Sequence, residues 1–230
     1  MRKLRNFAEL RQQAVRRLKD EGLLKDQGII RAMEKVPREE FLPYESKSYA
    51  YIDSPISIGW GQTTSALHMT ALFCEYGKIR VGLRVLEVGA GCGYMSCVYA
   101  EVVAPSGEPS KSRGHVWAAE IVKELAEFGK ANVERLGYAN RVTFVSADAS
   151  EGLKEWSPYD LIIVASASPD IPNEMTKQLA PSGILLIPVG GAHFYQELIR
   201  ITKMSDGSLS RENLGGVAFV PLRGKRGWKS

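Results

Sequence analysis

The sequence predicts an open, doubly wound α/β fold of the Rossmann-like kind, with helices ahead of the sheet. From Arg84 onward, short apolar segments alternate with stretches of helical spacing. Segments that are apolar throughout are typical of parallel strands buried on both faces. A glycine-rich turn also joins the first of these strands to a helix. Together these observations favour a parallel sheet covered on both sides, whose ligands bind beyond the carboxyl ends of the strands.

Helices are predicted at the N-terminal end over Phe7–Gly22 and Gln27–Val36, because their apolar residues recur at helical spacing. Gly22 ends the first helix. Pro37 ends the second, since proline disfavours a helical residue before it. The first helix also carries basic residues, which we interpret as a solvated face, with an interaction surface as the alternative. These residues are Arg11, Arg16, Arg17 and Lys19.

A polar, glycine-spaced segment, Ser57–Met69, precedes the sheet and leads into a predicted helix over 65–77. Thr63, Thr64 or Ser65 is placed to cap that helix through a side-chain oxygen. The same hydroxyl groups supply hydrogen-bond donors and acceptors at short range. We therefore expect this segment to be both the start of a helix and part of a binding site.

The α/β part is predicted to alternate strands and helices, interrupted by a Pro-, Gly- and Ser-rich surface loop at Pro105–Gly114. Strands are expected at Arg84–Val88, Val116–Glu120, Val142–Ser146, Tyr159–Ala165, Gly183–Pro188, Tyr195–Lys203 and Val217–Leu222. Helices are expected at Gly93–Val103, Val122–Leu136 and Glu174–Leu179. The chain is expected to form one domain over 1–230, with a helical part at 1–50 and the α/β core with its C-terminal strands at 51–230.

Composition narrows the class of protein. A formal net charge of +4 over 230 residues does not indicate a nucleic-acid partner. The three cysteines lack metal-ligand spacing, so no metal site is predicted, and reduced, buried thiols are expected. No apolar run reaches the roughly 20 residues that cross a bilayer, and the first residues do not resemble a secretory signal. We expect a cytoplasmic protein with neither a membrane nor a nucleic-acid partner.

The turn after the first strand has the sequence Glu87-Val-Gly-Ala-Gly-Cys-Gly93. Glycines at alternate positions let a ligand approach the main chain closely. The GxGxG spacing differs from the GxGxxG of dinucleotide-binding turns. It resembles motif I of the class I S-adenosylmethionine-dependent methyltransferases, with a plain tight turn as the alternative.

Acidic residues at strand ends support S-adenosylmethionine as the cofactor. Glu120 ends the second predicted strand, and Asp148 follows the third. An ionised carboxylate accepts two hydrogen bonds, which suits the hydroxyl groups of a ribose. A polar side chain after the third strand suits adenine. Each acid alone is more often a surface charge or a helix cap, but acids after successive strands favour a shared site.

Several segments of the chain resemble a known protein family. Residues Asp53–Met69, DSPISIGWGQTTSALHM, are similar to the signature loop of the protein-L-isoaspartate O-methyltransferases, whose usual form is IGxGQTISxPHM. Further similar segments are Val36–Pro43, Val85–Tyr94, Ser157–Val164, Gln178–Gly190, Gln196–Leu198 and Gly216–Leu222. The resemblance implies methyl transfer from S-adenosylmethionine to the free carboxylate of L-isoaspartyl residues, and less efficiently D-aspartyl residues, in damaged proteins and peptides, which initiates their repair.

The resemblance also implies the residues of the site. Ser65 matches the family's active-site serine, and we expect it to orient the substrate carboxylate through a hydrogen bond without becoming a covalent nucleophile. Glu120 is expected to hold the ribose, and Asp148 with Ala149 to contact the adenine. The predicted cofactor-binding residues are Gln62, Thr63, Thr64, Ser65, His68, Glu87, Gly89, Ala90, Gly91, Glu120, Ile121, Asp148 and Ala149.

Some positions depart from the family pattern. Ala147-Asp148-Ala149 stands where the family has GDG, and alanine is costly there if the backbone needs a positive φ. Thr64 replaces the isoleucine of QTIS, and Leu67 replaces the proline of xPHM. Ala165–Pro169 replaces a VTAAP-like turn. These departures bear on the adenine and peptide contacts more than on the reaction.

Residues after the fifth predicted strand complete the expected site. His193 and Gln196 are expected to line it from the far side, with a surface loop as the alternative for His193. Gly215–Pro221 is apolar enough to be a core strand, and it is also a candidate to present backbone groups to an extended peptide. The alternative functions are a class I methyltransferase acting on another acceptor, such as RNA or a small molecule, and a cofactor-binding module without catalysis.

Overall fold

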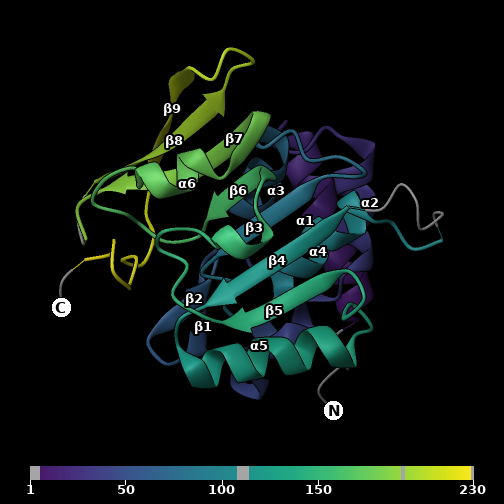
Figure 1. Cartoon of the computed structure of the whole chain (residues 1–230). Coiled ribbons are helices and arrows are strands. Elements are labelled where there is room, and N and C mark those ends of the chain that lie inside the picture. Colours follow the sequence, from purple (N-terminus) through teal and green to yellow (C-terminus); the bar gives the residue numbers. More distant parts are fainter. Residues whose placement is uncertain (1–5, 108–113, 193–194, 229–230) are drawn as a thin grey trace.

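The computed structural model describes residues 6–107, 114–192 and 195–228. Its centre is a seven-stranded sheet in the order β5-β4-β3-β6-β7-β8-β9 (Figure 1). The strands are β3 (Arg84–Val88), β4 (His115–Glu120), β5 (Val142–Ser146), β6 (Tyr159–Val164), β7 (Leu179–Gly190), β8 (Gln196–Lys203) and β9 (Leu209–Val217). The predicted doubly wound α/β fold is therefore confirmed.

The strand order reverses beside β3, which places the glycine-rich turn at the point where ligands bind in such sheets. Strands β4 and β5 lie on one side of β3, and β6 and β7 lie on the other, all in parallel. Val88 pairs with both Ala119 and Val164, so the carboxyl ends of β3, β4 and β6 are level. The residues that follow these strands therefore meet at one edge.

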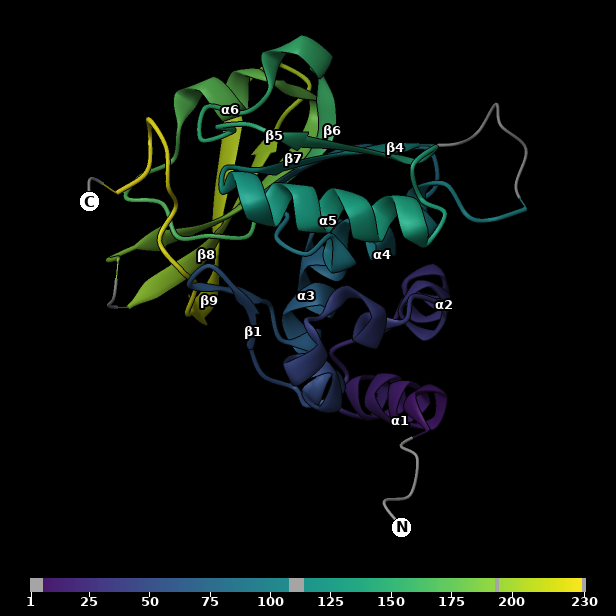
Figure 2. The same cartoon turned by 90° about the horizontal axis from the view of Figure 1, so that it is seen from below.

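The helices divide unequally between the two faces of the sheet (Figure 2). One face carries α1 (Phe7–Asp20), α2 (Gln27–Lys35), α3 (Leu67–Tyr76), α4 (Tyr94–Val103) and α5 (Lys123–Arg135), and the other carries the short α6 (Asn173–Lys177). Short 3-10 helices are η1 (Arg38–Phe41), η2 (Tyr44–Tyr49) and η4 (Lys154–Trp156). Over the described residues, no helix combines the length and apolar character needed to span a membrane.

The N-terminal helices have the predicted places and are held by side-chain caps. Asn6 accepts a hydrogen bond from the Glu9 N–H, and Asp26 accepts from the N–H groups of Gly28 and Ile29. Buried residues of both helices belong to the same apolar cluster as residues of β3, β6 and α4. We therefore propose that the helical part and the sheet fold as one domain.

The C-terminal end of the sheet differs from the prediction of a parallel sheet. Strand β8 pairs antiparallel with β7 and β9, because short loops rather than helical crossovers join these strands. The prediction of a strand at Val217–Leu222 is wrong, since β9 occupies Leu209–Val217. Most residues of β9 are exposed, and its middle is a polar run from Ser210 to Asn213, so no alternating apolar pattern marks the strand.

The polar segment before the sheet forms a β-hairpin that the sequence analysis missed. Strands β1 (Ile56–Gly59) and β2 (Gln62–Thr64) pair antiparallel. Trp60 and Gly61 form the turn with φ of 51° and 69°, as a two-residue turn of type I′ requires. The predicted helix cap is wrong, because α3 starts after Ala66 and has no side-chain cap.

Candidate active site

Three adjoining cavities lie at the carboxyl edge of the parallel strands. The edge cavity runs past the ends of β3 to β6, and its wall includes Glu120, Ala149 and Ser166. The inner cavity, of about 20 Å³, lies beside the glycine-rich turn and includes Glu87. The outer cleft, of about 950 Å³, is lined by the β1–β2 hairpin, the start of α3 and the segment 216–221. The sequence analysis predicts its ligand at this same edge of the sheet.

The glycine-rich turn borders two of these cavities. Gly89, Gly91 and Gly93 have φ of 83°, 55° and 85°, a backbone region that other residues rarely adopt. Gly89 and Gly91 line both the edge cavity and the inner cavity, and Ala90 lines the inner one. Without side chains at Gly89 and Gly91, a ligand reaches the main chain of the turn directly.

Glu120 is a buried carboxylate that faces the edge cavity. Its Oε2 accepts a hydrogen bond from the Gly91 N–H at 3.0 Å, and its Oε1 accepts from the Val122 N–H at 2.9 Å. Each carboxylate oxygen has a second acceptor site. The fold therefore fixes the orientation of Glu120 and leaves both oxygens able to accept from two hydroxyl groups of a ligand.

Glu87 lies deeper, at the wall of the inner cavity. Burial, and to a smaller extent the negative charge of Glu120, raise the pKa of its carboxyl to about 8, even though a hydrogen bond that Ser96 Oγ donates lowers it. The carboxyl is therefore largely protonated at neutral pH. In the unfolded chain, where the pKa is 4.5, it is ionised.

Glu87 is expected to make stability depend on pH. Because the folded state keeps a proton that the unfolded chain loses, its contribution is complete below about pH 4.5 and is lost as pH rises through 8. The unfolding free energy should fall by up to about 1.4 kcal/mol per pH unit across this window. Urea titrations of the wild type and Glu87→Gln at pH 5.5, 7 and 8 check this. The unfolding free energy of Glu87→Gln relative to that of the wild type should increase with pH. Parallel pH profiles of the two unfolding free energies would contradict the raised pKa of Glu87.

The alanines that replace the family's glycines after β5 fit the backbone without strain. Among the described non-glycine residues, positive φ occurs at Trp60, Lys78 and Ser182. Ala147 and Ala149 therefore do not need glycine, and both line the edge cavity. The family's GDG is thus replaced here at no conformational cost.

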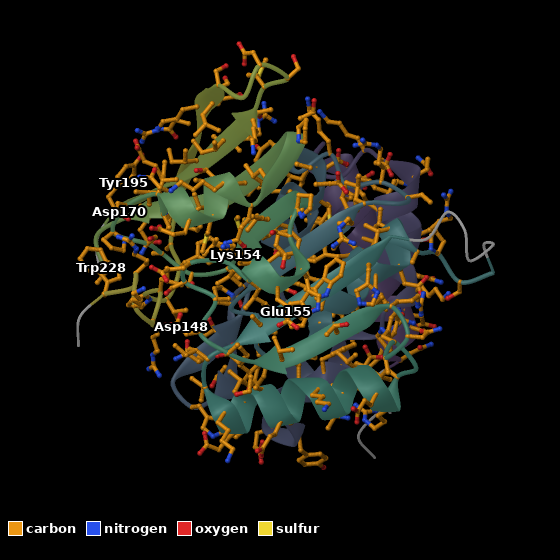
Figure 3. All side chains as sticks on the ribbon, in the orientation of Figure 1. Asp148, Lys154, Glu155, Asp170, Tyr195 and Trp228 are labelled. Atoms are coloured by element: carbon orange, nitrogen blue, oxygen red, sulfur yellow. The ribbon has the colours of Figure 1, made fainter. Side chains whose placement is uncertain are left out.

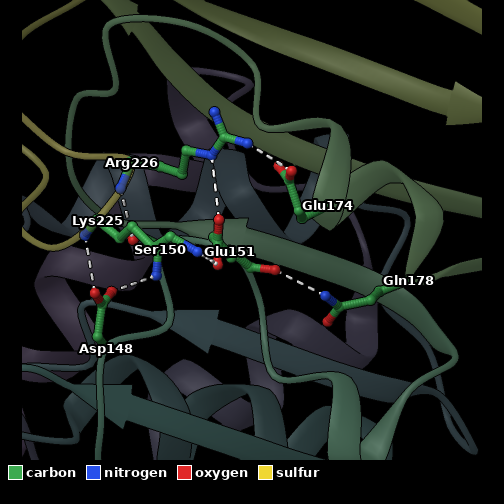
Figure 4. Close-up of polar contacts among 7 residues, drawn as sticks. All are labelled: Asp148, Ser150, Glu151, Glu174, Gln178, Lys225 and Arg226. Atoms are coloured by element: carbon green, nitrogen blue, oxygen red, sulfur yellow. Dashed lines mark hydrogen bonds and ion pairs between the residues drawn. The ribbon is translucent and has the colours of Figure 1, made fainter.

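Asp148 is placed differently from its two neighbours. Its side chain is exposed, and its carboxylate accepts hydrogen bonds from the N–H groups of Ser150 and Lys225, both at 2.9 Å (Figure 4). Asp148 lies near the arrowhead ends of β4 and β5, and Trp228 lies further out, toward the C-terminal end of the chain (Figure 3). Asp148 does not line the edge cavity. Its expected adenine contact stays a prediction, while its observed contact is with the C-terminal segment, residues 220–228.

The C-terminal segment borders the edge cavity and is held to the loop after β5. Arg226 forms ion pairs with Glu151 at 3.3 Å and with Glu174 at 2.5 Å (Figure 4). The Trp228 indole N–H donates to the Ala167 carbonyl at 3.1 Å. Residues 220–223 line the edge cavity. Residues 220–223, which are far in the sequence from the strands of this edge, therefore complete the wall of the edge cavity.

Ser65 stands between the inner cavity and the outer cleft and lines both. Its carbonyl accepts a hydrogen bond at 2.7 Å from Arg38 Nη2. The Arg38 side chain is fully buried, and within the described chain its Nε and Nη1 have no hydrogen-bond partner. Its guanidinium also lies 5.5 Å from the centre of the Tyr94 ring. A buried cation thus holds the main chain at Ser65.

Two small side chains lie in the walls of all three cavities. Thr63 and Ala165 each line the edge cavity, the inner cavity and the outer cleft. Thr64, next in the chain, is buried and lines the inner cavity. The three cavities therefore adjoin at Thr63 and Ala165.

His68 belongs to the outer cleft rather than to the two smaller cavities. Its Nδ1 lies 3.0 Å from Asp53 Oδ1, which also accepts from the His68 N–H at 2.9 Å. Arg17 lies 3.4 Å from the other carboxylate oxygen. Gln196 lines the same cleft, and its side-chain amide pairs with both backbone groups of Phe219. His193 lies outside the described residues.

Most of the predicted cofactor residues gather around the two smaller cavities. The edge cavity is lined by Gln62, Thr63, Gly89, Gly91, Glu120, Ile121 and Ala149. The inner cavity is lined by Thr63, Thr64, Ser65, Glu87, Gly89, Ala90 and Gly91. Their roles toward a cofactor stay predictions.

Several residues of the site were not predicted from the sequence. Arg38 lies within the family-like segment Val36–Pro43, and Asp53 begins the signature loop, so the resemblance marked both without giving a role. Ser166 lies in a turn noted as a departure from the family. Gly215–Pro221 was expected to present backbone groups to a peptide, and residues 216–221 line the outer cleft. That residues 220–223 also line the edge cavity was not expected, because their place depends on contacts with distant parts of the chain.

The lining of the edge and inner cavities suits S-adenosylmethionine. The edge cavity borders the ends of successive strands, with the glycine backbone of Gly89 and Gly91 and the fixed carboxylate of Glu120 in its wall. The fold and site thus define a class I S-adenosylmethionine-dependent methyltransferase.

Residues 9–227 match the family model described as protein-L-isoaspartate(D-aspartate) O-methyltransferase. The chain belongs to this family. The protein-L-isoaspartate O-methyltransferase of Hyperthermus butylicus is 48% identical over 223 residues, which cover 97% of this chain and 92% of that protein. That of Methanothermobacter thermautotrophicus is 44% identical, with 95% and 97% covered.

Two solved structures of proteins named for this activity resemble the fold of this chain. A Plasmodium falciparum beta-aspartate methyltransferase in complex with S-adenosyl-L-homocysteine is 27% identical, with a TM-score of 0.80. The match covers 93% of this chain and 98% of that one. A second protein-L-isoaspartate O-methyltransferase is 30% identical with a TM-score of 0.82, covering 94% of this chain and 67% of that one.

Proposed function

We propose that this protein transfers the methyl group of S-adenosylmethionine to the free carboxylate of L-isoaspartyl residues, and less efficiently D-aspartyl residues, in damaged proteins and peptides. The reaction initiates their repair. The observation that carries the proposal is the position of Ser65, which lines both the inner cavity and the outer cleft. A donor along the strand ends and a peptide in the outer cleft would meet there. Family membership supports the choice of acceptor.

The acceptor group needs no general base. A carboxyl group with an unperturbed pKa of about 4 is ionised at neutral pH and is already nucleophilic. Bound S-adenosylmethionine supplies an activated methyl group, whose transfer to a carboxylate oxygen leaves a methyl ester and a neutral thioether. The residues of this chain have to align the carboxylate and exclude water. The Ser65 hydroxyl is suited to hold one carboxylate oxygen so that the other faces the methyl group.

The outer cleft supports a peptide acceptor. Its volume of about 950 Å³ admits a segment of chain as well as a single side chain. The Gln196 side chain fixes the backbone of Phe219 in the wall of this cleft. We propose a cytoplasmic location for the reaction, supported by Cys74, Cys92 and Cys97, which are buried and free.

A methyl-transfer assay with paired peptides tests the proposal. Two peptides of the same sequence, one with an aspartyl and one with an isoaspartyl residue, are incubated with the full chain and radiolabelled S-adenosylmethionine. We expect a base-labile methyl ester on the isoaspartyl peptide alone. Equal labelling of the two peptides would contradict the acceptor. Labelling of RNA or of a small-molecule acceptor, with neither peptide labelled, would replace this function with the alternative methyltransferase.

A further inference from the structure

Ser166 is a buried polar side chain without a protein partner at the edge cavity. It follows β6 by two residues, at the carboxyl edge of the sheet. It is 6% exposed, and among the described residues its Oγ has no hydrogen-bond partner. Ser166 also lines the edge cavity. Since a buried hydroxyl is normally hydrogen-bonded, a ligand in that cavity is its natural partner.

The position of Ser166 along the sheet edge indicates which part of the donor it meets. A Cβ atom built on Gly89 would lie 3.7 Å from Ser166 Oγ, so the hydroxyl stands beside the first glycine of the turn. Glu120 ends β4 and Ala149 follows β5, on the other side of β3. Ser166 is therefore at the opposite end of the cavity from Ala149.

S-adenosylmethionine is long enough to cross several neighbouring strands, which are about 4.8 Å apart. With its ribose at Glu120 and its adenine near Ala149, its amino-acid part extends over β3 toward β6. That part carries a carboxylate and an ammonium group. A serine hydroxyl pairs with either, because it is both a donor and an acceptor.

We propose that the Ser166 hydroxyl binds the amino-acid part of S-adenosylmethionine and of the product S-adenosylhomocysteine. This role is additional to the residues expected from the family resemblance, where the same turn is VTAAP-like and here reads Ala165-Ser-Ala-Ser-Pro169. The inference rests on the proposed function only in its choice of donor and does not depend on the acceptor.

The chain offers a matched control in Ser168. It lies two residues further along the same turn and is fully buried, and within the described chain its Oγ is likewise without a partner. Ser168 lines none of the three cavities. Ser166→Ala and Ser168→Ala therefore remove the same buried hydroxyl from the same turn, but only the first removes it from the edge cavity.

Calorimetric titration separates the possibilities. The wild type and both variants are titrated with S-adenosylhomocysteine and with 5′-methylthioadenosine, which has the nucleoside and sulfur but no amino-acid part. For Ser166→Ala we expect a Kd for S-adenosylhomocysteine about tenfold weaker, as for loss of a hydrogen bond to a charged group. Its Kd for 5′-methylthioadenosine should stay within about twofold of the wild type, and Ser168→Ala should leave both unchanged.

Several results would overturn the inference. One is an unchanged Kd for S-adenosylhomocysteine in Ser166→Ala. Another is an equal loss for both ligands, which would place the hydroxyl on the nucleoside or in the shape of the cavity. Equal melting temperatures of the variants and the wild type show that folding is not the cause. Tight binding with no methylation of the isoaspartyl peptide would contradict the proposed function while leaving the role of Ser166 intact.

Discussion

Replacement of Ser65 by alanine is expected to lower turnover on an isoaspartyl peptide about 100-fold, because misplacing a reacting group by about 1 Å has an effect of that size. The affinity for S-adenosylhomocysteine should stay nearly unchanged. Ser65 lines the inner cavity and the outer cleft but not the edge cavity, where most of the donor is expected. The measurements are kcat with radiolabelled donor and Kd by calorimetry on the same preparation.

A control for this experiment is Ser210→Ala. Ser210 is exposed on β9 and lines none of the three cavities. Its replacement should leave kcat and Kd as they are. If Ser65→Ala methylated the peptide at the wild-type rate, Ser65 would have no role in the reaction. A loss of donor affinity as large as the loss in kcat would show that Ser65 acts by binding the cofactor and not by orienting the substrate carboxylate.

Replacement of Glu120 by alanine is expected to weaken the binding of S-adenosylhomocysteine by 100-fold or more. Glu120 is buried, and its carboxylate accepts hydrogen bonds from the N–H groups of Gly91 and Val122. Each hydrogen bond to a charged group contributes about 1.5–3 kcal/mol, and a ribose offers two hydroxyl groups. Glu120→Ala removes both expected hydrogen bonds to the ribose. It also removes the acceptor that holds the Gly91 N–H in the glycine-rich turn.

Two further variants show which part of the Glu120 effect comes from the carboxylate. Glu120→Gln keeps the size of the side chain and one acceptor oxygen, so its Kd should lie between those of the wild type and Glu120→Ala. Glu124→Ala removes an exposed acid in the first turn of α5 and should bind as the wild type does. A Kd for Glu120→Ala within about threefold of the wild type, well under 1.4 kcal/mol, would show that Glu120 does not hold the ribose.

The sequence predicted the centre of the fold well because burial on both faces leaves a strong pattern. Strands β3 and β5 have the predicted bounds, and β4 and β6 differ by one residue at one end. Strand β9 left no such pattern, since its residues are mostly exposed. The β1–β2 hairpin was missed because its strands are short, although a glycine after Trp60 suits a tight turn.

The candidate site was predictable where a residue's place follows directly from a strand end. Glu120 is the last residue of β4, so its position at the sheet edge follows from the strand itself. Asp148 lies two residues beyond β5, where the chain is free to turn, and its direction depends on a contact 77 residues away. The hydrogen bond from Arg38 to the Ser65 carbonyl is also a tertiary contact, which local pattern does not reveal.

The shared lining at Thr63 and Ala165 has a consequence for inhibitor chemistry. These small side chains lie in the walls of the edge cavity, the inner cavity and the outer cleft. The edge cavity and the outer cleft also share Val220 and Pro221. A compound that joins a nucleoside in the edge cavity to an isoaspartyl-like peptide in the outer cleft would therefore place its linker beside these four residues.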